Sequence, residues 1–100
     1  MAKKESSFQS KLIKEIKNRL PGCYVLKNDA GYLQGVPDLL VLYEDKWGTL
    51  ECKRSENAPH RPNQDIHVGR MNEMSFSRFI YPENKEEVLD EMVSTLRPGR

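Results

Sequence analysis

Cysteine is scarce in this sequence of 100 residues, which contains only Cys23 and Cys52. A small secreted domain held together by disulfides usually carries more cysteines, and these two lack the paired spacing of a zinc site. No apolar run reaches the roughly 20 residues that span a bilayer, and no apolar stretch follows the basic N-terminus, as a secretory signal requires. We therefore expect a protein without a membrane segment that works in the cytoplasm.

An excess of charge of either sign is also missing, since the formal net charge is +1. Any attraction to nucleic acid must therefore be local, along one face of the molecule. The basic side chains gather in the middle of the chain, at Lys53, Arg54, His60, Arg61, His67 and Arg70, and the acidic ones in its last third, at Glu83, Glu86, Glu87, Asp90 and Glu91. This asymmetry indicates one basic face and one acidic, solvated helix.

Helical and extended patterns alternate over what we expect to be a single domain, residues 1–100. Apolar side chains recur at helical spacing after Ser6, which forms a capping-box pattern with Gln9, and Pro62 suits the first position of a later helix. The expected elements are a helix at 6–20, strands at 23–28, 37–43 and 47–53, a helix at 62–74, a strand at 75–81, and a last helix capped by Asn84. This order predicts an α/β fold with a mixed sheet of about four strands flanked by about three helices.

Three ionisable residues fall on the central strands of the predicted sheet. Side chains alternate between faces along a strand, so Glu51 and Lys53 share a face and Cys52 points the other way. If residues 45–46 form a two-residue turn, residues whose numbers sum to 91 are paired. Asp38 then lies opposite Lys53 and diagonal to Glu51, within roughly 5–8 Å. A shift of one residue would move Asp38 to the other face.

Two carboxylates and one ammonium group on one face suit the hydrolysis of a phosphodiester. Asp38 and Glu51 offer the hard oxygen ligands that Mg²⁺ prefers, with Mn²⁺ as a substitute, and the backbone carbonyl of Cys52 offers another. The metal polarises the phosphate and lowers the pKa of a bound water, while Lys53 orients that water or stabilises charge in the transition state. Acids near strand ends are often plain surface residues, but Asp38 opens an otherwise apolar strand after the turn at 35–37.

The spacing of these residues also resembles a known motif. Pro37-Asp38, twelve intervening residues and Glu51-Cys52-Lys53 resemble the motif of the PD-(D/E)XK nuclease superfamily. The wider string is similar to the small phage Holliday-junction resolvases and to the virus-type replication-repair (VRR-NUC) nucleases, through Arg61-Pro62-Asn63-Gln64, Ser75-Phe76 and Tyr81-Pro82-Glu83-Asn84-Lys85. The resemblance implies a restriction-endonuclease-like core, but flap nucleases, resolvases and restriction enzymes share the motif.

Nucleases of this superfamily often add an acid from the first helix, where Glu5 and Gln9 are the candidate metal ligands here. Gln9 points with the apolar stripe of that helix, although it also completes the capping box, and Glu5 equally suits the helix dipole as a solvated acid. The resemblance also implies a supporting role for Gln64, in the first turn of the helix at 62–74, where exposed N–H groups attract phosphate. A structural capping role is the alternative for Gln64.

The residues expected to contact DNA flank this motif, since phosphate contacts position a nuclease on its substrate. Lys27 and Tyr32 border the loop before Asp38. The basic candidates are Lys27, Arg54, His60, Arg61, His67 and Arg70.

We therefore predict a Mg²⁺-dependent endodeoxyribonuclease of DNA repair or recombination. The leading hypothesis is a resolvase that cuts four-way or otherwise branched DNA, in the host cytoplasm if a phage encodes it. Paired nicks imply a homodimer, with the helix at 84–96 or the N-terminal helix as its interface. The alternative enzyme is a VRR-NUC-type nicking or flap nuclease, which needs no dimer. A third hypothesis is a DNA-binding module without catalysis.

Overall fold

The computed structural model describes residues 3–29 and 31–98, and the side chains of residues 3–6 lie outside that description. Its elements in chain order are α1 (Lys3–Arg19), β1 (Tyr24–Lys27), β2 (Leu39–Tyr43), β3 (Lys46–Cys52), α2 (Pro62–Met74), β4 (Ser77–Ile80) and α3 (Lys85–Leu96). The described part of the chain thus contains the strands and helices that the sequence predicts, in the predicted order.

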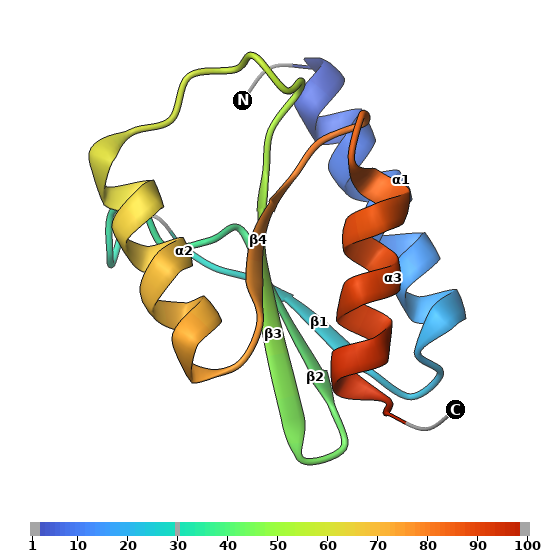
Figure 1. The fold of residues 1–100 in the computed structure, drawn as a ribbon. Coiled ribbons are helices and arrows are strands. Elements are labelled where there is room, and N and C mark those ends of the chain that lie inside the picture. Colours follow the sequence, from blue (N-terminus) through green and yellow to red (C-terminus); the bar gives the residue numbers. More distant parts are fainter. Residues whose placement is uncertain (1–2, 30, 99–100) are drawn as a thin grey trace.

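A single mixed sheet carries the fold, with the strand order β1-β2-β3-β4. β1 pairs antiparallel with β2 and β2 antiparallel with β3, while β3 and β4 are parallel. Parallel neighbours need a crossover between them, and α2 is that crossover. α1 and α3 cover one face of the sheet and α2 lies on the other (Figure 1). The predicted α/β class with a mixed sheet is confirmed.

The hydrophobic core lies between the sheet and the layer formed by α1 and α3. Side chains with no exposed surface come from both helices and from the central strands, and they include Leu12, Ile16, Leu39, Val41, Leu50, Leu89 and Met92. The alternation of β2 and β3 sends these apolar side chains to one face. The opposite face of the same strands is therefore available for polar residues.

The start of α1 differs from the sequence prediction. The helix begins at Lys3 rather than at residue 6, so Ser6 is not its N-cap and the predicted capping box with Gln9 is wrong. Lysine and glutamate are good helix formers, and the helix continues through them toward the N-terminus. Its other end agrees with the prediction to within one residue, since α1 ends at Arg19. Gly22, which follows, adopts a φ of 90°, the left-handed conformation in which glycine has no Cβ penalty.

The β2–β3 hairpin has the predicted faces but not the predicted register. Leu39 pairs with Leu50, so paired numbers sum to 89 rather than 91. The turn falls at residues 44–45, where Glu44 adopts the left-handed φ of 56° that a two-residue hairpin favours. A shift of two residues keeps each side chain on its face. Continuing this ladder by one pair puts Asp38 opposite Glu51, and not opposite Lys53 as the predicted register has it.

The two later helices begin where the sequence places them. α2 starts at Pro62, and Asn84 occupies the position before α3. The Asn84 side chain, however, does not cap α3: its Oδ1 accepts from the Tyr81 amide at 2.9 Å and its Nδ2 donates to the Phe79 carbonyl at 3.1 Å. Asn84 therefore closes the turn that leads out of β4.

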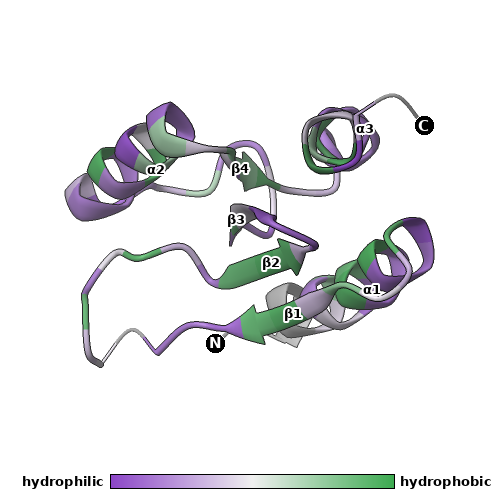
Figure 2. Cartoon of the chain, turned by 90° about the horizontal axis from the view of Figure 1, so that it is seen from below, coloured by the Kyte–Doolittle hydropathy of each residue, from purple (hydrophilic) through white to green (hydrophobic). Residues whose placement is uncertain are grey.

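α2 covers only part of its face of the sheet. This largely hydrophilic helix lies over the β3–β4 end, and none of the described helices lies over the hydrophobic β1–β2 end of the same face (Figure 2). Among the described helices, none is long and apolar enough to cross a membrane.

Candidate active site

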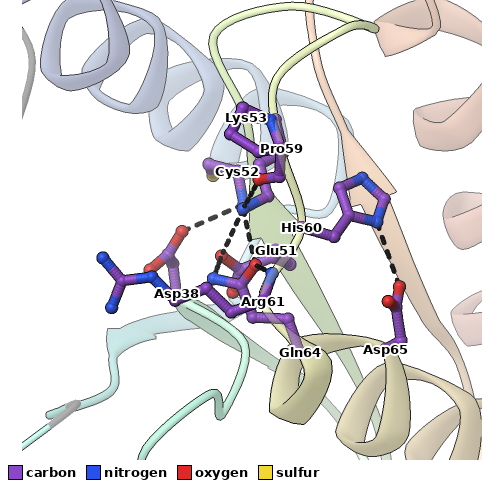
Figure 3. Close-up of polar contacts among 9 residues, drawn as sticks. All are labelled: Asp38, Glu51, Cys52, Lys53, Pro59, His60, Arg61, Gln64 and Asp65. Carbon is purple, nitrogen blue, oxygen red and sulfur yellow. Dashed lines mark hydrogen bonds and ion pairs between the residues drawn. The ribbon is translucent and has the colours of Figure 1, made fainter.

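Three elements meet at one end of the sheet. Asp38 directly precedes β2, Glu51 and Lys53 lie at the end of β3, and Gln64 lies in the first turn of α2. All four line one pocket of about 330 Å³. Arg54, Ala58, Pro59 and Arg61 complete its described lining. Figure 3 shows the polar contacts that connect these side chains. The structure therefore brings together the residues that the sequence singles out for catalysis.

Asp38 is held by backbone groups on two sides. Its Oδ2 accepts a hydrogen bond from the Cys52 amide at 3.0 Å, and its carbonyl accepts one from the Asn28 amide at 2.8 Å. The Asn28 side chain also donates to the Pro37 carbonyl at 2.7 Å. Backbone hydrogen bonds of this kind fix the position of a carboxylate before a ligand binds.

Glu51 and Lys53 are charged groups buried together. Only 4% of Glu51 and 8% of Lys53 is exposed, and their Oε2 and Nζ atoms lie 3.9 Å apart. Isolated charges at this depth would be strongly unfavourable, so each needs hydrogen-bond partners. The Lys53 ammonium donates to the Pro59 carbonyl at 3.2 Å and to Gln64 Oε1 at 2.6 Å. The ammonium is thereby held beside the Glu51 carboxylate.

Gln64 connects the acid and the base of this pair. Its Oε1 accepts from Lys53 Nζ, and its Nε2 donates to Glu51 Oε2 at 3.0 Å. The same Oε1 accepts from the backbone amide of Arg61 at 3.0 Å, which is the back-bond of a helix start. The contacts expected of a supporting residue and those expected of a capping residue thus occur together in one side chain, and the supporting role itself stays a prediction.

The donor set of the pocket fits a hard divalent cation. Asp38 and Glu51 present carboxylates to one pocket, and the described residues contain no group of three or more His, Cys, Asp or Glu placed to hold a metal. Mg²⁺ commonly takes one or two carboxylates and keeps several waters, so it needs no larger group. The Cys52 side chain is fully buried in the core, on the side of the sheet away from Glu51 and Lys53, as predicted.

Of the two candidates on α1, the structure describes the side chain of Gln9 only. Gln9 is buried, as its position on the apolar stripe predicts, but no described residue of α1 lines the pocket. The side chain of Glu5 lies outside the described residues. Metal contact by either residue stays a prediction.

The basic candidates divide into two groups. Arg54 and Arg61 line the pocket, whereas the other four, Lys27, His60, His67 and Arg70, do not. The His60 ring stacks on Phe79 with 3.9 Å between the ring centroids, and its Nδ1 lies 3.0 Å from Asp65 Oδ1. Protein contacts therefore hold the His60 ring beside the site.

Sequence reasoning missed two backbone features of the site. The Pro59 carbonyl accepts from Lys53, and a backbone acceptor leaves no signature in the amino-acid sequence. Gly35 has a φ of 82°, and a Cβ atom there would lie 2.5 Å from Asn63 Cβ. The loop before Asp38 therefore approaches the first turn of α2 more closely than any side chain permits. The glycine itself was visible in the sequence, but its partner was not.

Comparison with known proteins supports the fold. No family model matches this chain, and no curated protein matches it either. A solved structure described as a VRR_NUC domain superposes on it with a TM-score of 0.72 and 24% sequence identity. The match covers 89% of this chain and 97% of that one. The chain thus has the fold of a VRR_NUC domain, and the restriction-endonuclease-like core expected from the sequence is confirmed.

Proposed function

We propose that this chain is a metal-dependent endonuclease that hydrolyses phosphodiester bonds in DNA. The observation that carries the proposal is the convergence of Asp38, Glu51 and Lys53 in one pocket, with Gln64 bridging the last two. Likeness to a VRR_NUC domain supports the same class of reaction. An acid and a base buried together in a cleft, here with 4% of Glu51 and 8% of Lys53 exposed, is an arrangement that is concentrated at functional sites.

Asp38 and Glu51 would hold the metal, Mg²⁺ or its substitute Mn²⁺, with the Cys52 carbonyl as a further ligand. A bound ion of this kind polarises the phosphate and lowers the pKa of a water. The hydrogen bond from the Cys52 amide holds the Asp38 carboxylate, and Gln64 holds that of Glu51. Both carboxylates are thus oriented by neutral donors before the cation arrives.

Lys53 acts on the reacting phosphate. Its ammonium is fixed by Pro59 and Gln64 within 3.9 Å of Glu51. A buried cation in a set position stabilises the negative charge that builds on the phosphate oxygens in the transition state. It also orients the attacking water. Gln64 is a positioning residue in this scheme, because it acts through Lys53 and Glu51.

DNA would reach the pocket along its basic rim. Arg54 and Arg61 are exposed and line the pocket, so they are placed to contact the phosphates next to the scissile bond. Lys27, His60, His67 and Arg70 would then contact the backbone further away.

We propose branched DNA as the substrate, cut during repair or recombination in the cytoplasm. Two modes are open to one active site. A resolvase makes paired nicks in a four-way junction and works as a homodimer with two sites, whereas a flap or nicking nuclease of the VRR-NUC type works on one strand. Likeness to a VRR_NUC domain supports the flap or nicking nuclease as the alternative to the resolvase.

The test compares four labelled substrates: an immobile four-way junction, a 5′ flap, a nicked duplex and an intact duplex. Each is incubated with Mg²⁺, with Mn²⁺ and with EDTA. Asp38→Asn and Glu51→Gln should lower the cleavage rate by at least about 100-fold. DNA binding should persist or tighten, because a negative charge near phosphate is removed. Asp45→Asn, in the exposed turn of the same hairpin, is the matched control and should cleave like the wild type.

The outcomes separate the hypotheses. Paired symmetric nicks in the junction, together with a dimer in sedimentation at micromolar concentration, support the resolvase. Cleavage of the flap or nicked duplex by a monomer supports the VRR-NUC type. Full turnover by Asp38→Asn would refute the assigned site. If the protein binds DNA but cleaves none of the substrates, the hypothesis of a DNA-binding module without catalysis is supported.

A further inference from the structure

A second pocket lies on the loop that leads to Asp38. It has a volume of about 420 Å³ and is lined by Asn28, Asp29, Tyr32, Leu33 and Val36. We propose that it binds one unstacked nucleobase of the DNA, beside the phosphate that the active site cleaves. The inference rests on the proposed nuclease function and deepens it, because it says which feature of the DNA the enzyme selects.

The exposed ring of Tyr32 is the first observation. Its exposed fraction is 91%, the largest among the exposed apolar side chains of the described residues. Leu33, next to it in the same pocket, is also exposed. An aromatic ring and an aliphatic side chain left in water around a concave site offer a stacking platform for a planar, apolar-faced ligand.

The charge of the lining distinguishes a base from a phosphate. No described lining residue of this pocket is cationic, and Asp29 contributes a carboxylate. A carboxylate repels phosphate but accepts hydrogen bonds from the exocyclic amino groups of bases. Lys27, the exposed residue just before the pocket, is placed for the backbone of the same nucleotide. The lining therefore favours the base as occupant.

The loop is attached to the catalytic carboxylate. Asn28, which lines the pocket, donates through its amide to the Asp38 carbonyl and through its side chain to the Pro37 carbonyl. Asp29 orders the next turn by accepting from the amide of Gly31 at 2.8 Å. A base held here is thus in a fixed position relative to Asp38. A base in a continuous duplex must first be unpaired and unstacked at an energetic cost, which is least for a base that is already single-stranded, as in a flap.

The test uses Tyr32→Ala, with Tyr32→Phe as the conservative variant. Tyr24→Ala is the matched control, because Tyr24 is also largely exposed but lies at the far end of β1. On the best branched substrate, Tyr32→Ala should lower kcat/KM roughly ten-fold, as expected for one lost base–aromatic contact. Tyr32→Phe and Tyr24→Ala should retain the wild-type value, and all variants should keep the wild-type melting temperature.

An abasic-site scan around the cut identifies the bound base. Removal of the base at one position of the substrate should reduce the kcat/KM of the wild type by a similar factor. The same removal should not reduce the kcat/KM of Tyr32→Ala any further, because both changes remove the same contact. If no abasic position is coupled to Tyr32, the proposal is overturned. If a position coupled to Tyr32 is found in the flap substrate but not in the four-way junction, the bound base lies in the single strand. If it is found in the junction but not in the flap, the bound base lies at the branch point.

A binding measurement separates this proposal from the nuclease proposal. The branched DNA carries 2-aminopurine at the coupled position, or at each position near the branch if nothing is cleaved, and is titrated with Asp38→Asn in EDTA. Stacking on Tyr32 should quench the fluorescence, and the Asp38→Asn/Tyr32→Ala double variant should not. If Tyr32 quenches the fluorescence but the wild type cleaves no substrate, the nuclease proposal is refuted and the base pocket stands. If the wild type cleaves but the quenching does not depend on Tyr32, the base pocket is refuted and the nuclease proposal stands.

Discussion

Gln64 shows how much of this site depends on a single side chain. It accepts from Lys53 and from the Arg61 amide, and it donates to Glu51. The first and last of these contacts position the charged groups, and the second stabilises the start of α2. A loss of Gln64 should therefore affect both rate and stability, by amounts that can be measured separately.

Gln64→Ala should lower kcat by about 10- to 100-fold while KM changes little, because Lys53 and Glu51 lose their shared partner but the basic rim is intact. The free energy of unfolding should fall by about 1–3 kcal/mol, because the back-bond is lost and the buried Lys53 and Glu51 each lose a hydrogen-bond partner. Single-turnover cleavage and urea titration measure the two effects. The pH–rate profile should also change, which a purely structural role would not cause.

The control for this variant is Asn63→Ala, one residue earlier in the same turn. It retains the Cβ that faces Gly35 and should keep wild-type kcat. An equal loss of rate in both variants would mean that the first turn of α2 matters as a whole, and Gln64 would then have no special position.

Contacts between elements decide where the site residues lie, and one of them joins the β1–β2 loop to the start of α2 at Gly35. Gly35 and Gly22 both have left-handed backbones, with φ of 82° and 90°. A Cβ at Gly35 would collide with Asn63, whereas a Cβ at Gly22 would have no heavy atom within 4 Å. The two glycines therefore separate backbone strain from steric contact.

Gly22→Ala should reduce the free energy of unfolding by about 1 kcal/mol, the penalty of a left-handed non-glycine residue. Gly35→Ala should cost more, about 3 kcal/mol, because strain and overpacking combine. Gly35→Ala should also slow cleavage, since it moves the loop before Asp38 away from Gln64. Urea unfolding and cleavage assays on both variants check this, and equal destabilisation would contradict the contact with α2.

The pairing of α1 with α3 has a polar component at their edge. Glu15 Oε1 lies 2.5 Å from Lys85 Nζ, and this hydrogen bond raises the pKa of Lys85, with a smaller contribution from Glu86. Because the pKa of Lys85 is raised in the folded state, the stabilisation of the fold by this ion pair is complete below the lysine pKa of the unfolded chain, about 10.4. It is lost as the pH rises through the higher folded pKa.

Lys85→Met should therefore lower the free energy of unfolding at pH 7 by about 0.5 kcal/mol, a small value because both side chains are partly solvated. The difference from the wild type should shrink above about pH 10.5. Lys14→Met, an exposed α1 residue, is the control. Urea titrations from pH 7 to pH 11 measure the trend, and a difference that stays constant over this range would show that the substitution acts through packing alone.

At the scale of the whole molecule, the proposed binding of DNA depends on how a net charge of +1 is distributed over the surface. The pocket places Arg54 and Arg61 at its rim, so binding should be strongly salt-dependent without a large global charge. Each neutralised phosphate contributes about 0.9 to the slope of log affinity against log salt.

Arg61→Gln should weaken the binding of every DNA substrate to a similar degree and reduce that slope by about one. Fluorescence anisotropy with Asp38→Asn in EDTA measures this from about 50 mM to 200 mM salt, without cleavage of the probe. Lys11→Gln, an exposed change on α1, should leave the slope unchanged. A substrate-specific loss in Arg61→Gln would indicate base contact instead of phosphate contact.

The amino-acid sequence by itself determined the class of fold, the α2 boundaries and the faces of β2 and β3. These follow from local periodicity and from residues such as Pro62, whose effect on the backbone does not depend on distant partners. For the same reason Asp38, Glu51 and Lys53 could be assigned to one face although their register was wrong by two residues, because a shift of two preserves the face.

Only the tertiary structure decided the register, the contacts of Lys53 and which cations reach the pocket. The backbone conformation at Glu44 set the turn, and no motif there specified it. Pro59 contributes a carbonyl, which every residue has. Arg61, the residue just before α2, lines the pocket, while Arg70, within that helix, does not. The parallel crossover brings only the start of α2 to the end of β3. Such proximities arise from strand pairing and helix packing, which join residues that no local pattern connects.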